Sequence, residues 1–181
     1  MSILDGLYAE GIDPAVLADK VRRGIDLARR NMPPEAGELL SLLAEGVSLA
    51  DIAGLGEQHK EALFQLGCRL MVCDEVGQAE AIFTTLSLLD PLEARAHYGA
   101  GVARQVKGDV EGAAQSFLLF LALDATDPNG YLRLGECLTA AGEFDEAQSA
   151  FQVAVKLAEN GHGSQATIDE ATRQISLISQ R

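Results

Sequence analysis

The sequence lacks tryptophan and has few cysteines, few prolines and no long hydrophobic run. Its longest unbroken apolar stretch, residues 117–123, has seven residues, whereas a membrane-spanning helix needs about 20. The odd number of cysteines (Cys68, Cys73 and Cys137) fits neither a disulfide framework nor a metal-ligand pattern. We therefore expect no membrane insertion, and three small buried thiols in a reducing compartment.

Basic residues are also scarce, with 14 Lys and Arg against 27 Asp and Glu and a net charge of −13. Such an acidic surface repels phosphate backbones and anionic membranes, so neither nucleic acid nor membrane is an expected partner. The N-terminus opens with Asp5 and Glu10 and lacks the basic flank and apolar run of a secretory signal. These features predict a cytoplasmic location.

Groups that could perform chemistry are dispersed. His59, His97 and His162 lie in three different segments, with no carboxylate spaced for a metal or nucleophile motif. Acidic pairs such as Asp74-Glu75 and Asp145-Glu146 stand at predicted turns or helix starts, where they interact favourably with the helix dipole. The sequence therefore predicts no catalytic residue, metal site or cofactor, and a protein that is not an enzyme.

What the sequence does contain is a repeat of 34 residues. Three columns of identical residues define it: Gly67, Gly101 and Gly135; Ala79, Ala113 and Ala147; Phe83, Phe117 and Phe151. Small residues let two helices approach closely, and the aromatic ring fills the space against the next unit. The columns resemble those of the tetratricopeptide repeat, a helix-turn-helix unit, with units at 60–93, 94–127 and 128–161. We interpret them as packing residues.

Helix-boundary signals agree with this register. Asp90-Pro91 and Asp127-Pro128 each place an N-cap acceptor before a proline suited to the first helical turn. Gly108 and Gly142 stand where the first helix of a unit must turn into the second, and Asp74 takes that position in the first unit. The predicted fold is all-α, with three tetratricopeptide repeats in a right-handed superhelical solenoid.

The flanking segments also have helical patterns. Residues 1–59 predict an N-terminal helical extension, in which Ser48 and Asp51 form a capping box. Residues 162–181 predict a capping helix begun by Thr167 and Glu170, because the last apolar face of a solenoid must be covered.

The first helices of stacked repeats line a concave groove that typically holds an extended peptide. The residues at its facing positions are mainly apolar, which suits an apolar ligand segment, whereas a groove for acidic C-termini would need more cations and amides than Arg95 and Asn129. For Val72 and Val106, a place in the core is at least as good an interpretation. The remaining predicted groove residues are Phe64, Cys68, Met71, Arg95, Tyr98, Val102, Gln105, Leu132 and Glu136.

Several segments together resemble bacterial type III secretion chaperones of translocator proteins, the tetratricopeptide-repeat class. They are residues 45–52 (EGVSLADI), 63–90, 99–105 and 136–138, and the resemblance covers residues 38–160. It implies a chaperone that keeps hydrophobic translocators soluble and unassembled before export. It adds Leu89 to the groove and implies a homodimer through the N-terminal helices, here Leu39 to Ile52. The alternative is a generic repeat scaffold that assembles another complex.

Overall fold

The computed structural model describes residue 42 and residues 47–180. The chain divides into two compact units, residues 1–56 and 57–181. Most of the predicted N-terminal helical extension lies outside the described residues, as does half of the predicted dimerisation segment, Leu39 to Ile52.

In the first unit the structure describes one short helix, α3 (Leu49–Ile52). The Ser48 hydroxyl accepts a hydrogen bond from the Asp51 amide at 3.1 Å, and the Asp51 carboxylate accepts one from the Ser48 amide at 3.1 Å. This reciprocal pair satisfies two helix-end donors, and the predicted capping box is confirmed.

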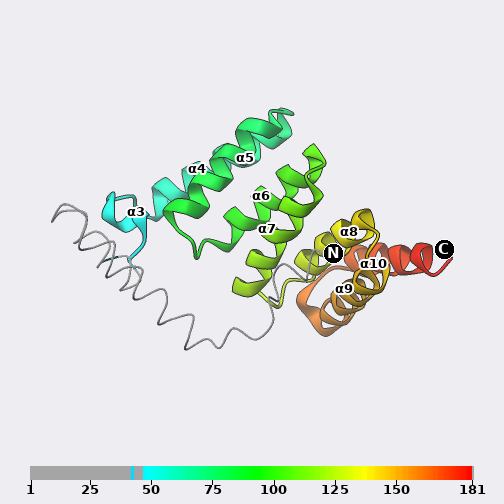
Figure 1. Ribbon diagram of the computed structural model, residues 1–181. Helices are drawn as coiled ribbons and strands as arrows, with labels where there is room; N and C mark the ends of the chain where they lie inside the picture. Colours follow the sequence, from blue (N-terminus) through cyan, green and yellow to red (C-terminus); the bar gives the residue numbers. More distant parts are fainter. Residues whose placement is uncertain (1–41, 43–46, 181) are drawn as a thin grey trace, which may run out of the picture. The chain divides into compact units, whose positions relative to one another are not determined.

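The second unit consists of successive helices packed side by side, coloured from green to red in Figure 1. All regular structure among the described residues is helical, which confirms the predicted all-α class. The elements are α4 (Glu57–Val72), α5 (Val76–Leu89), α6 (Ala94–Lys107), α7 (Val110–Leu123), α8 (Pro128–Ala141), α9 (Phe144–Leu157), the π-helical turn η1 (Ala158–His162) and α10 (Gln165–Ile178). No helix in this described part is long and apolar enough to cross a bilayer.

The turns inside the three helix pairs share one backbone conformation. Gly108 and Gly142 end α6 and α8 in the left-handed region, with φ of 81° and 84°. Asp74, at the equivalent position of the first pair, has a φ of 63° although it carries a side chain. The predicted turn positions are therefore confirmed, and the first pair makes the same turn in a less favourable way.

Two predicted helix starts differ from the structure. Asp127 caps α8 and Pro128 opens it, as predicted, but Asp90 instead follows the end of α5, and α6 begins only at Ala94 after the cap residue Glu93. The Asp90 carboxylate accepts from Lys60 Nζ at 2.7 Å and so ties the end of α5 to α4. The last helix is capped by Ser164, not by Thr167 and Glu170.

The 34-residue columns meet inside each helix pair. A Cβ atom added to Gly67, Gly101 or Gly135 would lie 2.6, 2.7 or 2.6 Å from the ring of Phe83, Phe117 or Phe151. Ala79, Ala113 and Ala147 are fully buried. Phe83 also lies against Gly99 of the next pair, where an added Cβ would be 2.7 Å from the ring. Each ring therefore requires a glycine opposite it.

The C-terminal helix α10 packs on α9 and α8. It buries Ala171 completely and leaves Thr167 only 7% exposed. The cysteine prediction is correct for Cys137, which is buried, and wrong for Cys68 and Cys73, which are exposed.

Candidate functional site

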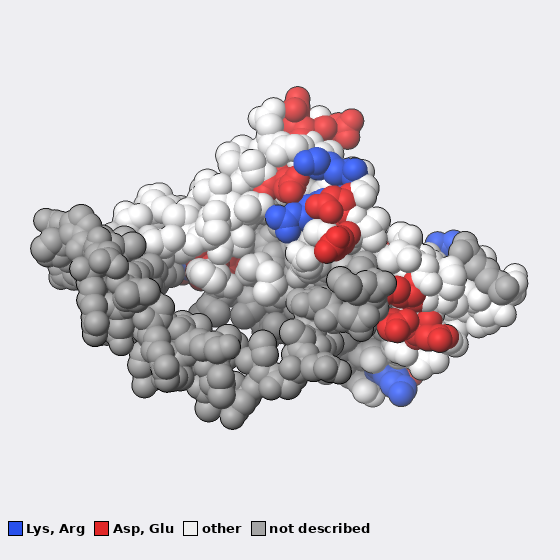
Figure 2. All heavy atoms as spheres, viewed as in Figure 1, with Lys and Arg blue, Asp and Glu red and all other residues white. Residues whose placement is uncertain are grey.

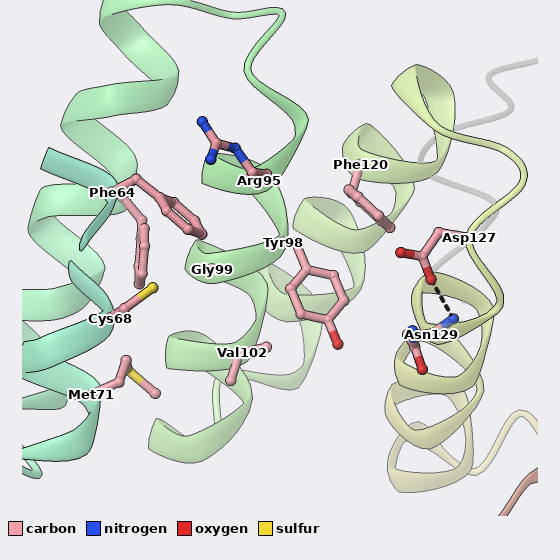
Figure 3. A pocket seen from close by; sticks show the side chains of 11 residues that line it. Phe64, Cys68, Met71, Arg95, Tyr98, Gly99, Val102, Phe120, Asp127 and Asn129 are labelled. Carbon is pink, nitrogen blue, oxygen red and sulfur yellow. Dashed lines mark hydrogen bonds between the residues drawn. The ribbon is translucent and has the colours of Figure 1, made fainter. Parts of the chain in front are cut away.

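A cavity of about 500 Å³ opens between the first helices of the repeats. Figure 3 shows its walls, with α4 on one side, α6 in the middle and the start of α8 on the other. The lining residues are Phe64, Cys68, Met71, Phe83, Arg95, Tyr98, Gly99, Val102, Phe120, Asp127 and Asn129.

Aromatic rings form much of the cavity surface. Phe64 of α4 contacts Phe83 with ring centroids 5.8 Å apart, and Tyr98 of α6 lies 5.1 Å from Phe120 and 5.6 Å from Phe117 in edge-to-face geometry. These ring pairs fix one another at favourable spacings, so the wall is preformed. Cys68 and Met71 complete it with polarisable side chains that adapt to irregular ligand shapes.

The single cation of this wall, Arg95, is already paired. Its guanidinium lies 4.6 Å from the centre of the Phe64 ring and binds Glu61 and Glu93, each at 2.8 Å. The hydrogen bonds that Arg95 donates to the Glu93 and Glu61 carboxylates raise the pKa of Arg95 above its ordinary value. Arg95 thus covers one face of the Phe64 ring at the edge of the cavity. Because two carboxylates pair with its charge, it does not offer a free charge to an anionic ligand.

The opposite end of the cavity is polar and belongs to the start of α8. The main-chain N–H of Asn129 donates to Asp127 Oδ1 at 2.7 Å, the contact drawn as a dashed line in Figure 3. Thr167 Oγ1 of α10 donates to Asn129 Oδ1 at 3.3 Å. The cavity therefore combines an aromatic centre with a small hydrogen-bonding end.

The surroundings carry paired charges. Glu80 of α5 binds Arg104 at 3.1 Å and Lys107 at 2.6 Å, both on α6. Figure 2 shows acidic and basic side chains beside one another on this face of the described part, with uncharged surface around them. No group of His, Cys, Asp or Glu within residues 47–180 is arranged to hold a metal ion.

Besides Val72 and Val106, the sequence predicts ten groove residues, and six of them line this cavity: Phe64, Cys68, Met71, Arg95, Tyr98 and Val102. Leu89, Gln105, Leu132 and Glu136 are not among the lining residues, and Gln105 donates to Glu136 at 2.7 Å. Val72 and Val106 are 88% and 61% exposed, so they belong neither to the core nor to the cavity wall.

Sequence reasoning missed several lining residues. The sequence pattern assigns Phe83 to packing only and does not assign Phe120 or Asp127 to the groove. Phe83 and Phe120 come from second helices, and Asp127 from the loop before α8. A rule that counts positions along first helices cannot find them, although the phenylalanine column was a usable signal for Phe83.

No family model matches the chain. The chain is similar to the low calcium response locus protein H of Yersinia pestis, with 27% identity over 117 residues, 65% of this chain and 70% of that protein. Among solved structures, the translocator chaperone SycD of Yersinia enterocolitica matches with a TM-score of 0.67 over 69% of this chain and 86% of SycD. Its 24% identity establishes the fold alone.

PcrH of Pseudomonas aeruginosa gives the stronger relation, with 30% identity, a TM-score of 0.65 and coverage of 69% of this chain and 95% of PcrH. A second PcrH structure holds the chaperone-binding region of PopD, with 31% identity, a TM-score of 0.67 and coverage of 71% and 96%. The likeness spans almost all of PcrH. The chain belongs to the tetratricopeptide-repeat family of type III secretion translocator chaperones.

Proposed function

We propose that this chain is a cytoplasmic chaperone that binds an extended apolar segment of translocator proteins in the cavity between α4, α6 and α8. By covering that segment it keeps the translocator soluble and unassembled before export, and it acts by binding and not by catalysis. The relatives support this proposal, since PcrH has been solved with the chaperone-binding regions of both PopD and PopB.

The observation that carries the proposal is the aromatic cavity with its paired cation. Burying one Leu, Val or Phe side chain stabilises a complex by about 1.5–3 kcal/mol, and a cavity of about 500 Å³ accommodates several such side chains. Because Arg95 is held by Glu61 and Glu93, an acidic ligand would gain little here. An apolar client segment is therefore favoured over an acidic one.

Co-expression with a translocator tests the proposal. Phe64→Glu and Tyr98→Glu place a charge in the cavity wall and should abolish the soluble complex. Val72→Glu on α4 and Val106→Glu on α6 are matched controls, because these side chains are exposed on the same two helices and do not line the cavity. All four variants should keep the helical circular dichroism of the wild type.

If Phe64→Glu and Tyr98→Glu still hold the translocator in solution, the client does not occupy this cavity. If the Val72 and Val106 controls also lose the client, the effect is a general one of added charge and the assignment fails in the same way.

We also propose a homodimer through the segment Leu39–Ile52. Its described part supports this, because Leu49 and Ile52 are each 37% exposed at the surface of α3. Light scattering should give twice the chain mass for the wild type and a smaller mass for Leu49→Glu combined with Ile52→Glu. A wild-type monomer at micromolar concentration would contradict the proposal.

A further inference from the structure

We infer that Asn129 and Asp127 bind the main chain of the client segment, and that the C-terminal helix α10 holds Asn129 in the orientation this requires. The inference deepens the proposed function and rests on it. It gives α10 a part in recognition as well as in covering the end of the repeats.

The hydrogen-bond chain behind Asn129 has one consistent direction. The Thr167 amide donates to Ser164 Oγ at 3.3 Å, and the two hydroxyl oxygens lie 3.1 Å apart. Ser164 therefore donates its hydroxyl hydrogen to Thr167 Oγ1, and Thr167 Oγ1 donates its own to Asn129 Oδ1 at 3.3 Å. This sequence satisfies both hydroxyls and uses the oxygen of the Asn129 side chain.

The nitrogen of the same amide is left available. Within residues 47–180 no group accepts a hydrogen bond from Asn129 Nδ2, although the side chain is half-buried and lines the cavity. No buried side-chain nitrogen or oxygen of the described residues lacks a partner, so Asn129 Nδ2 is open to solvent in the free chain, and a ligand acceptor would take the place of water there. Asn129 is therefore a donor prepared for a carbonyl oxygen.

Asp127 supplies the matching acceptor. Its Oδ1 accepts from the Asn129 main-chain amide, and Figure 3 shows its other carboxylate oxygen turned away from that contact, toward the cavity. In an extended peptide the N–H and C=O of one residue point to the same side. One client residue can thus donate to Asp127 and accept from Asn129 while its neighbours place side chains among the rings.

This arrangement has a consequence for client choice. A proline at the residue that contacts Asp127 has no N–H to donate, so it would leave the carboxylate unpaired in the complex. Prolines in the client segment are then tolerated over the aromatic wall and excluded at this one position.

The experiment uses the full chain and a synthetic peptide of the client's chaperone-binding segment, with affinity measured by calorimetry. Asn129→Ala should weaken binding about tenfold, the effect of leaving one buried carbonyl unpaired. Thr167→Val, which removes the hydroxyl that orients Asn129, should weaken binding about threefold. Thr139→Val is the matched control, because Thr139 lies on the same helix as Asn129, α8, but donates to its own helix at the Gly135 carbonyl.

A scan of backbone esters along the peptide separates direct contact from a structural effect. An ester replaces the peptide N–H by oxygen, so it removes that donor and weakens the carbonyl acceptor of the same bond without changing side chains. With wild-type protein two successive ester positions should each weaken binding by about tenfold: the one that removes the N–H donated to Asp127 and the one that weakens the carbonyl bound by Asn129. With Asn129→Ala the second position should lose its effect while the first is unchanged.

The inference is overturned if Asn129→Ala binds as tightly as wild type, or if its loss adds to that of every ester. These results are distinct from failure of the proposed function, in which the wild-type chain does not bind the peptide or Phe64→Glu binds it normally. If Thr167→Val and Thr139→Val lower the melting temperature equally and neither changes the affinity, α10 only covers the end of the repeats and takes no part in recognition.

Discussion

The first and third repeats have the same internal packing but different surroundings. Gly67 and Gly135 each stand where an added Cβ would lie 2.6 Å from a phenylalanine ring. In α4, however, Gly67 is the single buried residue, whereas α8 buries Pro128, Gly130, Leu134, Gly135, Cys137 and Leu138. The helix α8 packs against α7, α9 and α10, and α4 packs against α5 and α6.

The comparison shows that the 34-residue register determines how the two helices of one unit pack. The neighbouring helices determine which residues of the first helix remain available to a ligand on its groove-facing side. In the first repeat Phe64, Cys68 and Met71 occupy this side and remain available to a ligand. In the third repeat the equivalent residues are Leu132, Glu136 and Thr139, which are half-buried, and Glu136 is held by Arg133 and Gln105.

Thiol chemistry should show the contrast most strongly. Burial raises the pKa of Cys137 in the third repeat to about 11, which lowers its thiolate fraction at pH 8 about a hundredfold relative to an ordinary thiol. Cys73 is exposed and should react first with a thiol reagent. Partial desolvation at the cavity wall also raises the pKa of the exposed Cys68, which should react more slowly than Cys73 and be protected by client.

Mass spectrometry after timed labelling can assign each site. Fast modification of Cys137 in the folded chain would contradict the buried third repeat, and equal protection of Cys68 and Cys73 by client would contradict the cavity.

Glycine substitutions should separate the two repeats in stability. Gly135→Ala forces the fully buried Phe151 ring to move, and we expect a loss of about 2–3 kcal/mol in the free energy of unfolding. Gly67→Ala pushes Phe83, whose ring can shift into the cavity, and should cost about 1 kcal/mol while weakening client binding. Urea unfolding of the two variants measures the difference, and equal losses would show that the cavity gives Phe83 no freedom.

Acid should weaken the attachment of the first repeat. Hydrogen bonds from Lys107 and Arg104 lower the pKa of Glu80 below its usual value, so its stabilisation is complete above that usual value and is lost as pH falls through the lowered one. The equivalent position in the second repeat is the buried Ala114, which does not titrate. Glu80→Gln should cost about 1 kcal/mol at pH 7 and reduce the loss of stability between about pH 5 and pH 3.

Hydrogen exchange at the two pH values gives the location. Acid-dependent exchange that is larger in α8 and α9 than in α4 and α5 would contradict this assignment.

The smallest effect concerns the turn between the paired helices. Asp74→Gly gives the first repeat the residue that the second and third have as Gly108 and Gly142, and should raise stability by about 0.5 kcal/mol because the left-handed φ is then unstrained. The reverse change, Gly108→Asp, should lower it by about 1 kcal/mol. Thermal unfolding measures both, and a loss on Asp74→Gly would mean that the Asp74 side chain contributes more than its backbone strain costs.

The sequence predicted those parts of the molecule that depend on local spacing. The glycine, alanine and phenylalanine columns placed three helix pairs, and Gly108, Gly142 and Asp127 located their ends. Asp90-Pro91 misled because the carboxylate is used by Lys60 from another helix, a contact that local sequence does not reveal. Ser164 was missed as the cap of α10 for a simpler reason, since Thr167 and Glu170 have the same spacing one turn later.

Site residues were predictable only in part. Phe64 and Tyr98 could be assigned to the cavity from their positions in the repeat. Whether Phe120 and Asp127 line it depends on how the second helix pair packs against the third. Val72 and Val106 have the composition of wall residues, but both stand near helix ends, where their side chains face outward.

The carboxylates around Arg95 also have different consequences for the association rate and the dissociation rate of a client. The chain as a whole carries a charge of −13, and that field acts on an approaching basic segment at distances where no contact exists. Within the cavity the cation is already neutralised by Glu61 and Glu93. Added salt should therefore slow the association of a basic client and leave its dissociation rate nearly unchanged, because apolar contacts govern release.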